Sequence, residues 1–198
     1  MTVIANGIGK IKCGTYERID VEGMGFAQAP IAAKKIHVSG TLKGKKVRCT
    51  EQMKVEGIIG GDIQFGARTR FQAILGNAVI EKQENGHTSF DVEGELRADV
   101  VAVEMFKIKG HCRINSLEAV EVILCPNPPS KNKSLKNRKS EVGEIVCDRL
   151  VAYGLKAEKV VAEEVQLYDA CEIGTLICKR KTYCSPDCII MNELERQN

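Results

Sequence analysis

The chain has 198 residues, a formal net charge of +3 and an aromatic content of 5% with no tryptophan. So few rings cannot fill a large globular core, and so small a net charge does not indicate a protein that binds nucleic acid. No stretch is long and apolar enough for a transmembrane helix. The segment Met1–Lys12 also lacks the apolar run of a secretory signal, so we expect a cytoplasmic protein.

One five-residue pattern, apolar-polar-apolar-polar-glycine, recurs along the first 110 residues. Its closing glycines are separated by 17, 17, 37 and 16 positions, and a degraded copy, Phe71–Gly76, divides the long gap. Strand-like alternation with a period near 17 predicts a solenoid, in which each coil buries its apolar side only by stacking on its neighbours. The five copies are Ile19–Gly23, Ile36–Gly40, Met53–Gly57, Phe90–Gly94 and Phe106–Gly110.

The stretch from Ile31 to Val55 shows how one coil is expected to fold. Its apolar positions advance in steps of six, five and six residues, which add up to one 17-residue turn. This spacing predicts three short strands that meet at corners and enclose a triangular core, with alternate side chains pointing inward. We therefore predict an all-β fold, a single-stranded parallel β-helix (solenoid) with about 15–18 residues per coil.

Four segments are expected along the chain. Residues 1–124 form β-helix coils, and residues 125–141 form a basic, flexible loop rich in proline, asparagine and serine. Residues 142–185 continue the β-helix, because the apolar alternation resumes there, and residues 186–198 form a C-terminal tail. The loop is therefore an insertion in one solenoid. The residues expected to carry the coil pattern through the degraded region are Ile63, Phe65, Phe71 and Val79.

The basic loop has two interpretations, and the sequence leaves both open. Between Pro126 and Ser140 there are five cations and no carboxylate, and such a charged insertion can simply face the solvent. The same cations can instead contact an anionic membrane at its inner face, or an acidic protein partner. No aromatic residue interleaves with them, so we expect no nucleic-acid partner. The candidate contact residues are Lys131, Lys133, Lys136, Arg138 and Lys139.

Nine cysteines without a secretory signal indicate reduced thiols. Cys13, Cys49 and Cys112 fall at alternating positions among repeat residues, as small buried hydrophobes do. Four later cysteines are candidate ligands of a structural zinc ion, but their spacing lacks paired CxxC motifs. We therefore expect ordinary core residues and a loop thiol, with no cofactor. The four candidates are Cys171, Cys178, Cys184 and Cys188.

Other motifs do not support an enzyme. The run Gly40–Lys46 resembles a phosphate-binding loop, but it is one residue short and lacks the closing Ser or Thr. The segment Gly7–Gly9 lacks the third glycine of a dinucleotide fingerprint. The histidines His37, His87 and His111 fall at outward or corner positions, where a solvated side chain is the expectation. We therefore predict no catalytic residues.

The glycine-terminated repeat and its glycine-rich corners, over residues 7 to 180, resemble the bactofilins, which are bacterial polymer-forming cytoskeletal proteins. This resemblance implies a right-handed β-helix that assembles end to end into non-polar filaments without nucleotide. It also implies roles in cell shape, envelope-enzyme positioning or motility. The partners it implies are further copies of the chain or a related second chain, and envelope or motility proteins. The inserted loop departs from the family plan.

The ends of a solenoid expose strand edges that can template the addition of another chain. We therefore predict a non-enzymatic scaffold that self-assembles end to end. A monomeric adaptor that binds a protein or membrane through one face or the basic loop is the main alternative. A β-helix acyltransferase fits less well, because it needs strict six-residue steps. The predicted polymer interface consists of Ile4, Ile8, Ile11, Ile189, Ile190 and Met191.

Overall fold

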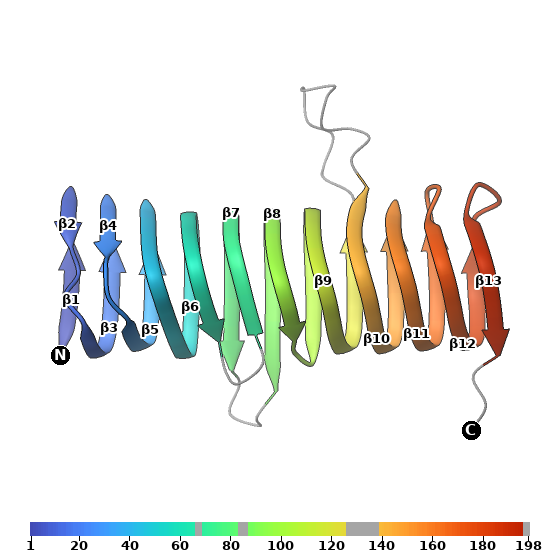
Figure 1. Cartoon of the computed structure of the whole chain (residues 1–198), viewed down its shortest axis with the longest axis horizontal. Coiled ribbons are helices and arrows are strands. Elements are labelled where there is room, and N and C mark those ends of the chain that lie inside the picture. The colour runs from blue at the N-terminus through green and yellow to red at the C-terminus, as the bar shows by residue number, and fades with distance from the viewer. Residues whose placement is uncertain (66–68, 83–86, 126–138, 196–198) are drawn as a thin grey trace.

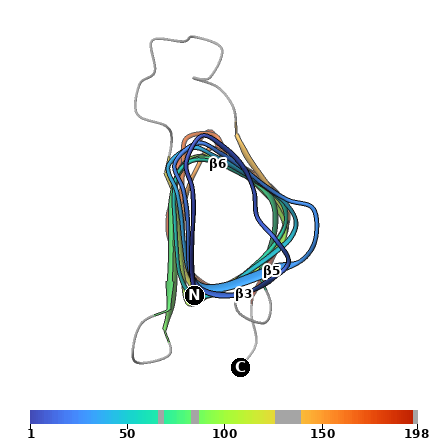
Figure 2. The same ribbon diagram turned by 90° about the vertical axis from the view of Figure 1, so that its left-hand side faces the viewer.

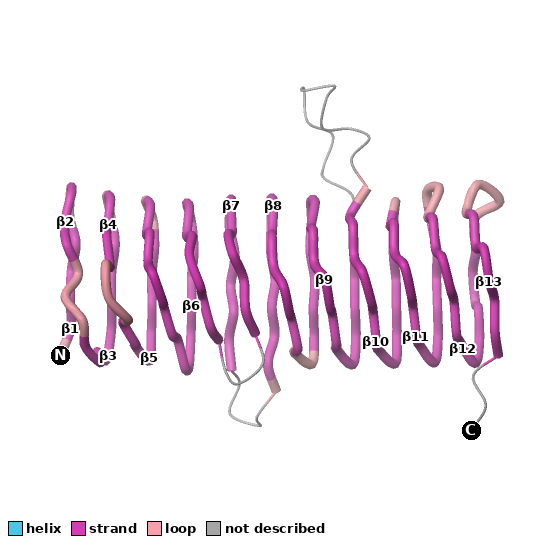
Figure 3. Tube along the Cα trace, viewed as in Figure 1, coloured by secondary structure: helices cyan, strands magenta, loops and turns pink. Residues whose placement is uncertain are grey.

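The computed structural model describes residues 1–65, 69–82, 87–125 and 139–195, which stack into one elongated rod (Figures 1 and 3). The rod is 85% strand and has about 11 turns. No helix occurs among the described residues. Apart from the reversed coil β7 (Thr69–Lys82), the coils wind in a right-handed sense, because the nearer strands in Figure 1 run downwards as the chain advances from the N-terminal to the C-terminal end. The prediction of an all-β solenoid is therefore confirmed.

Several of the strands bend around corners, so one strand can cover more than one face of the rod. The strands, in chain order, are β1 (Thr2–Ala5), β2 (Ile8–Lys10), β3 (Gly14–Val21), β4 (Met24–Ala27), β5 (Ile31–Val38), β6 (Thr41–Phe65), β7 (Thr69–Lys82), β8 (Thr88–Ala102), β9 (Met105–Cys125), β10 (Ser140–Tyr153), β11 (Leu155–Tyr168), β12 (Glu172–Cys184) and β13 (Ile189–Glu195).

Three faces run along the rod, and its cross-section is roughly triangular (Figure 2). The first face begins with β1, the second face begins with β2, and the third face begins with Gly14–Tyr16 of β3. Most neighbouring coils pair in parallel, with equivalent residues side by side, as Ile36 lies beside both Ile19 and Met53. Stacking at this register places each inward side chain against its counterpart in the next coil.

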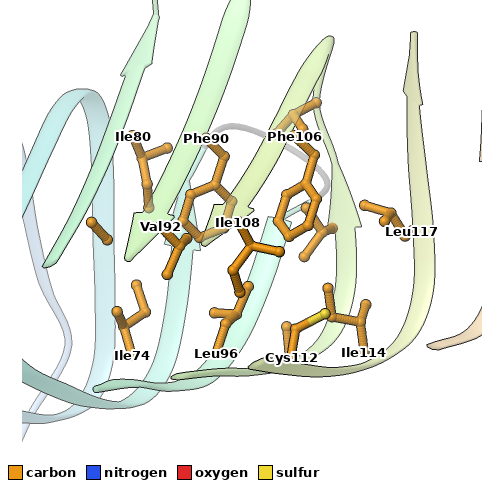
Figure 4. Packing of buried hydrophobic residues seen from close by; sticks show 14 of the residues in the cluster. Ile74, Ile80, Phe90, Val92, Leu96, Phe106, Ile108, Cys112, Ile114 and Leu117 are labelled. Carbon is orange, nitrogen blue, oxygen red and sulfur yellow. The ribbon is translucent and has the colours of Figure 1, made fainter. Parts of the chain in front are cut away.

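The inward side chains form continuous apolar columns along the rod. On the third face, Val101, Leu117, Ile145 and Val160 follow one another in register, and all four are fully buried. Figure 4 shows the middle of this core, where the rings of Phe90 and Phe106 meet edge to face with centroids 5.6 Å apart. Burial of each such side chain contributes about 1.5–3 kcal/mol. A core this narrow suits branched aliphatic residues, which explains the low aromatic content.

The closing glycines of the repeat form a single column at the corner between the first and second faces. A Cβ atom on Gly40 would lie 2.1 Å from the carbonyl oxygen of Gly23, and one on Gly57 would lie 2.1 Å from that of Gly40. No side chain fits at this spacing, because neighbouring backbones pack directly on one another. The column continues through pairing of Gly57, Gly76, Gly94 and Gly110. The repeat glycines are therefore explained by backbone contact between coils.

One coil runs in the opposite direction to the others. β7 pairs in antiparallel fashion with β6 and with β8, so the chain crosses all three faces backwards before it resumes its original direction. The expectation that the degraded region continues as an ordinary coil is therefore wrong in direction. Val79 points outward in β7, whereas its neighbour Ile80 is buried. An alternating apolar pattern reads the same in both directions, so the sequence gives no signal of the reversal.

The C-terminal coils extend farther than predicted. β10 pairs in parallel with β9, so the solenoid does continue after residues 126–138, which lie outside the described part. The predicted tail over residues 186–198 is wrong for Ile189–Glu195, because β13 pairs with β12 and forms the second and third faces of the last described coil. The expectation that Cys13 is buried is wrong, because this residue lies exposed beside a corner. Cys49 and Cys112 are buried as predicted.

Candidate functional site

The two ends of the described rod present strands that are paired on one side only. Among the described strands, β1 pairs with β3 alone, and β13 pairs with β12 alone. Their outer edges carry backbone N–H and C=O groups that have no strand partner within the described residues. Such edges are templates for pairing with another chain.

The N-terminal end exposes part of the predicted interface. The side chains of Ile4 and Ile8 are 62% and 81% exposed. Ile11 is 4% exposed and belongs to the core, because it points inward beneath the first coil. The structure therefore brings Ile4 and Ile8 to the end surface and assigns Ile11 a packing role.

The C-terminal end carries both apolar and acidic side chains, since Glu193 and Glu195 of β13 pair in register with the inward Leu176 and Cys178 of β12. Ile189 and Met191 are 57% and 76% exposed, whereas Ile190 packs partly against the core. Leu194, which the sequence analysis did not select, is 55% exposed on the same strand. It was missed because the residues that follow Ile189 were expected to be a tail, so their alternation was not examined for a coil.

The described residues consist of complete turns. Every described coil except β7 visits the first, second and third faces in that order, and β1 lies on the first face. The last part of β13, Asn192–Glu195, pairs with Thr175–Cys178 on the third face. A second copy stacked beyond β13, with its N-terminal β1 facing this C-terminal end, would therefore continue the coil in phase.

A tyrosine ladder leads towards the C-terminal end at the corner after the first face. The rings of Tyr153 and Tyr168 stack with centroids 4.5 Å apart, and those of Tyr168 and Tyr183 stack at 4.6 Å. Burial raises the pKa of the Tyr153 hydroxyl, and the neighbouring Tyr168 adds to this effect. Tyr183 is 46% exposed at the last step of the ladder. Offset stacking of this kind adds about 0.5–1.5 kcal/mol per ring pair to the burial of the rings.

The four candidate zinc ligands do not form a metal site in the described residues, where no group of three or more possible ligands is found. Cys171 and Cys178 occupy buried, inward positions, and Cys184 and Cys188 are partly buried. Burial raises the pKa of Cys171 to about 11, and the adjacent Cys188 thiol adds to the shift. A thiol with so high a pKa is a poor nucleophile at neutral pH.

The predicted contact residues of the basic loop lie mostly outside the described residues, namely Lys131, Lys133, Lys136 and Arg138. Lys139 is described, and its Nζ atom lies 2.7 Å from Oε1 of Glu172. This ammonium group holds the pKa of the Glu172 carboxyl below its ordinary value of 4.5. Lys139 therefore links two coils that lie on either side of the coil carrying Lys156.

The histidines do not assemble a catalytic site with any described nucleophile. His37 lies between two carboxylates, with Nε2 3.3 Å from Glu56 and Nδ1 3.9 Å from Asp20. His87 pairs with Glu104. His111 follows the corner glycine Gly110, as the sequence indicates.

An apolar groove crosses the second face near the N-terminal end, and the sequence analysis did not detect it. Its volume is about 860 Å³. Gly44, Gly60 and Gly61 line it without side chains that would fill the space, and Ile8 and the half-buried ring of Phe26 supply apolar surface. The groove is formed by four successive coils, so it has no signature in any short stretch of sequence.

Six exposed cations surround this groove or the corner beside it. None of them forms an ion pair with another described residue. The six cations lie within residues 10–12 and 43–48, which contain no carboxylate, and Asp62 is the only carboxylate in the segments 26–30 and 60–64 of the coils beside them. The run of cations in residues 43–48 was visible in the sequence, but was considered only as a failed phosphate-binding loop. We call the six residues the cationic rim: Lys10, Lys12, Lys43, Lys45, Lys46 and Arg48.

No protein-family model, curated protein or solved structure matches this chain. No described helix could cross a membrane. The arrangement of the described residues offers two surfaces with unsatisfied binding potential, namely the apolar ends with their open strand edges, and the groove with its cationic rim.

Proposed function

We propose that this chain is a non-enzymatic structural scaffold that assembles end to end into nucleotide-independent filaments, as its resemblance to the bactofilins implies. The observation that carries the proposal is the match between the two described ends. Both expose apolar side chains beside open strand edges, and the complete turns let one copy follow another in phase. Assembly in phase would give a polar filament, in contrast to the non-polar filament that the resemblance implies. Strand pairing across such a junction gives every edge N–H and C=O group a partner.

Negative-stain electron microscopy of the reduced protein without nucleotide tests assembly directly. We expect filaments whose width matches one rod or a small bundle of rods. Dispersed single rods at high protein concentration and physiological salt would contradict the proposal.

Charge substitutions at the ends locate the interface. We expect Ile8→Glu and Met191→Glu each to abolish filaments, because the junction would bury an unpaired carboxylate. Val120→Glu is the matched control, since Val120 is similarly exposed but lies on the side of the rod. This variant should still assemble.

Mixing the two end variants shows which ends meet. If the N-terminal end of one copy meets the C-terminal end of the next, the mixture forms dimers through the one unaltered pair of ends, and each variant alone stays monomeric. If like ends meet, each variant alone forms dimers. Analytical ultracentrifugation separates these results.

A further inference from the structure

The apolar groove on the second face is open to the solvent and its cations lack carboxylate partners among the described residues. Elsewhere in the described rod, several cations of the outer surface are joined to carboxylates, as Arg149 is to Glu121 and Arg180 is to Glu164. A group of cations that gains nothing from its own chain raises the local potential and attracts an anionic partner.

We infer that this groove is a docking site for an extended acidic segment of a partner protein, with carboxylates on the cationic rim and an apolar side chain against Phe26. The inference goes beyond the proposed scaffold function, because the groove lies on the side of the rod. It names an attachment surface on the side of the rod that meets the proposed N-terminal interface only along β2, at Ile8.

The dimensions of the groove suit a short peptide. Lys10, Phe26 and Lys43 lie side by side on consecutive coils, and Gly60 occupies the coil that follows. Three coil spacings of about 4.8 Å give a length of about 14 Å. An extended chain of five residues spans about 16–18 Å. A segment of five or six residues laid along the rod therefore reaches from Lys10 past Gly60.

The shape and composition favour a peptide over other anionic partners. A lipid bilayer presents a broad surface and requires apolar side chains that project beyond the cations, whereas Phe26 lies within the recess. Single-stranded nucleic acid binds through several aromatic rings on which successive bases stack, and Phe26 is the single ring among the described residues of the lining. Apart from the open edge of β2, the backbone groups of the coils that line the groove are paired with neighbouring strands, so recognition depends mainly on side chains.

Fluorescence anisotropy with a defined probe tests the inference. The probe is a fluorescein-labelled hexapeptide, Glu-Leu-Glu-Glu-Leu-Glu, titrated with the full chain. We expect saturable binding that weakens as salt is added, because exposed charge pairs are screened. A peptide with Lys in place of every Glu should not bind. Failure of the acidic probe to bind would overturn the inference.

Two double variants with the same change in charge locate the site. We expect Lys43→Glu with Lys45→Glu to weaken binding of the probe about tenfold or more, since two attractions become repulsions. The control is Lys35→Glu with Lys109→Glu, where both lysines are exposed and neither lines the groove. It should bind within about twofold of the parent chain. Equal weakening by both variants would contradict docking in the groove.

Phe26→Ala examines the apolar contact while the rim remains intact. We expect it to weaken the Leu-containing probe severalfold and to leave the weaker binding of an all-Glu hexapeptide unchanged. Circular dichroism spectra that match the parent show that each variant is folded.

Rival partners are tested in the same titration. Vesicles with 30% anionic phospholipid, a composition on the order of that of bacterial inner leaflets, are added as one competitor. A single-stranded oligothymidylate is added as the other. If either displaces the probe at lower concentration than unlabelled peptide does, the docking inference is wrong and the groove serves that ligand. Because end-to-end assembly is measured separately by microscopy, loss of probe binding does not bear on the scaffold proposal.

Discussion

The N-terminal region (residues 1–65) and the C-terminal region (described residues of 105–195) build the same coil but use their charges differently. In the C-terminal region, alternating charges run along the stack, where Glu121, Arg149, Glu164 and Arg180 occupy successive coils in register. Arg149 lies 3.0 Å from Glu121, and Arg180 lies 2.9 Å from Glu164. In the N-terminal region, the cationic rim has no such partners among the described residues. The ladder cations of the C-terminal region stabilise their own stack, whereas the rim cations of the N-terminal region stay available for a partner, although Arg18, Lys34 and Lys54 of that region do pair with carboxylates.

The corners of the two regions differ as well. The N-terminal region turns at a glycine column in which backbones touch, whereas the C-terminal region turns beside the tyrosine ladder. At that corner Gly154, Asp169 and Ala170 all have positive φ values between 52° and 58°. The comparison shows that the chain can turn this corner in two ways, with glycines that leave room for the backbones to touch or beside stacked tyrosine rings.

The largest expected effect comes from a side chain placed in the glycine column. Gly40→Val should lower the free energy of unfolding by about 3 kcal/mol or more, because its Cβ atom would meet the carbonyl oxygen of Gly23 at 2.1 Å. Gly154→Asn, at the other kind of corner, should cost less than about 1 kcal/mol, since asparagine tolerates positive φ. Urea unfolding followed by circular dichroism measures both. Equal losses would remove the distinction between the corners.

A smaller effect is expected from charge reversal in the stacked ladder. Arg149→Glu should lower the urea midpoint, because it sets a third carboxylate between Glu121 and Glu164. Lys43→Glu on the cationic rim should leave the midpoint unchanged or raise it. The difference between the two variants should shrink in about 1 M salt, where exposed charges are screened. If Lys43→Glu is as damaging as Arg149→Glu, the rim cations have structural partners after all.

The same ladder should make the C-terminal region sensitive to acid. Hydrogen bonding from Arg180 holds the pKa of Glu164 below its ordinary value of 4.5, and Lys139 does the same for Glu172. A carboxyl group whose pKa is lowered in the folded state stabilises the fold fully when the pH is above the ordinary pKa of that group. This contribution is lost as the pH falls through the lowered, folded-state pKa. Hydrogen exchange of β11 and β12 should therefore rise as the pH is lowered from about 5 towards 3, after correction for intrinsic rates. Glu164→Gln should flatten this dependence, and an unchanged profile would contradict it.

The smallest expected effect is a gain. Ala170 has a φ of 52°, a left-handed conformation that a Cβ atom disfavours. Ala170→Gly should therefore raise the free energy of unfolding, by up to about 1 kcal/mol. Ala162→Gly is the control, because Ala162 is a buried strand residue, and this change should destabilise the fold. Thermal melts of the two variants should move in opposite directions.

Much of this fold could be predicted from alternation and glycine spacing. Ile36 and Met53 were placed inward by their positions in the repeat, and the closing glycines proved to be one column. The direction of β7 could not be predicted, because a period of two has no direction. β13 was missed because the turn over Cys184–Cys188 interrupts the period.

The surfaces were harder to predict than the core. Ile8 and Met191 could be proposed as end residues from their positions alone, whereas the burial of Ile11 depends on how the first coil closes. The groove could not be found, because Lys10 and Lys43 are far apart in sequence and become neighbours of Phe26 only through stacking. Sites built across coils have no linear motif.

The complete turns of the described rod would give a polymer a fixed sidedness. If each copy continues the coil of the last in phase, the second faces of all copies line up, apart from the gentle twist of the stack. A rod of about 11 layers at about 4.8 Å each adds roughly 50 Å to the filament. The grooves would then recur in a row on one side of the filament at that interval. Partners bound in them would therefore be held at a regular spacing along the filament.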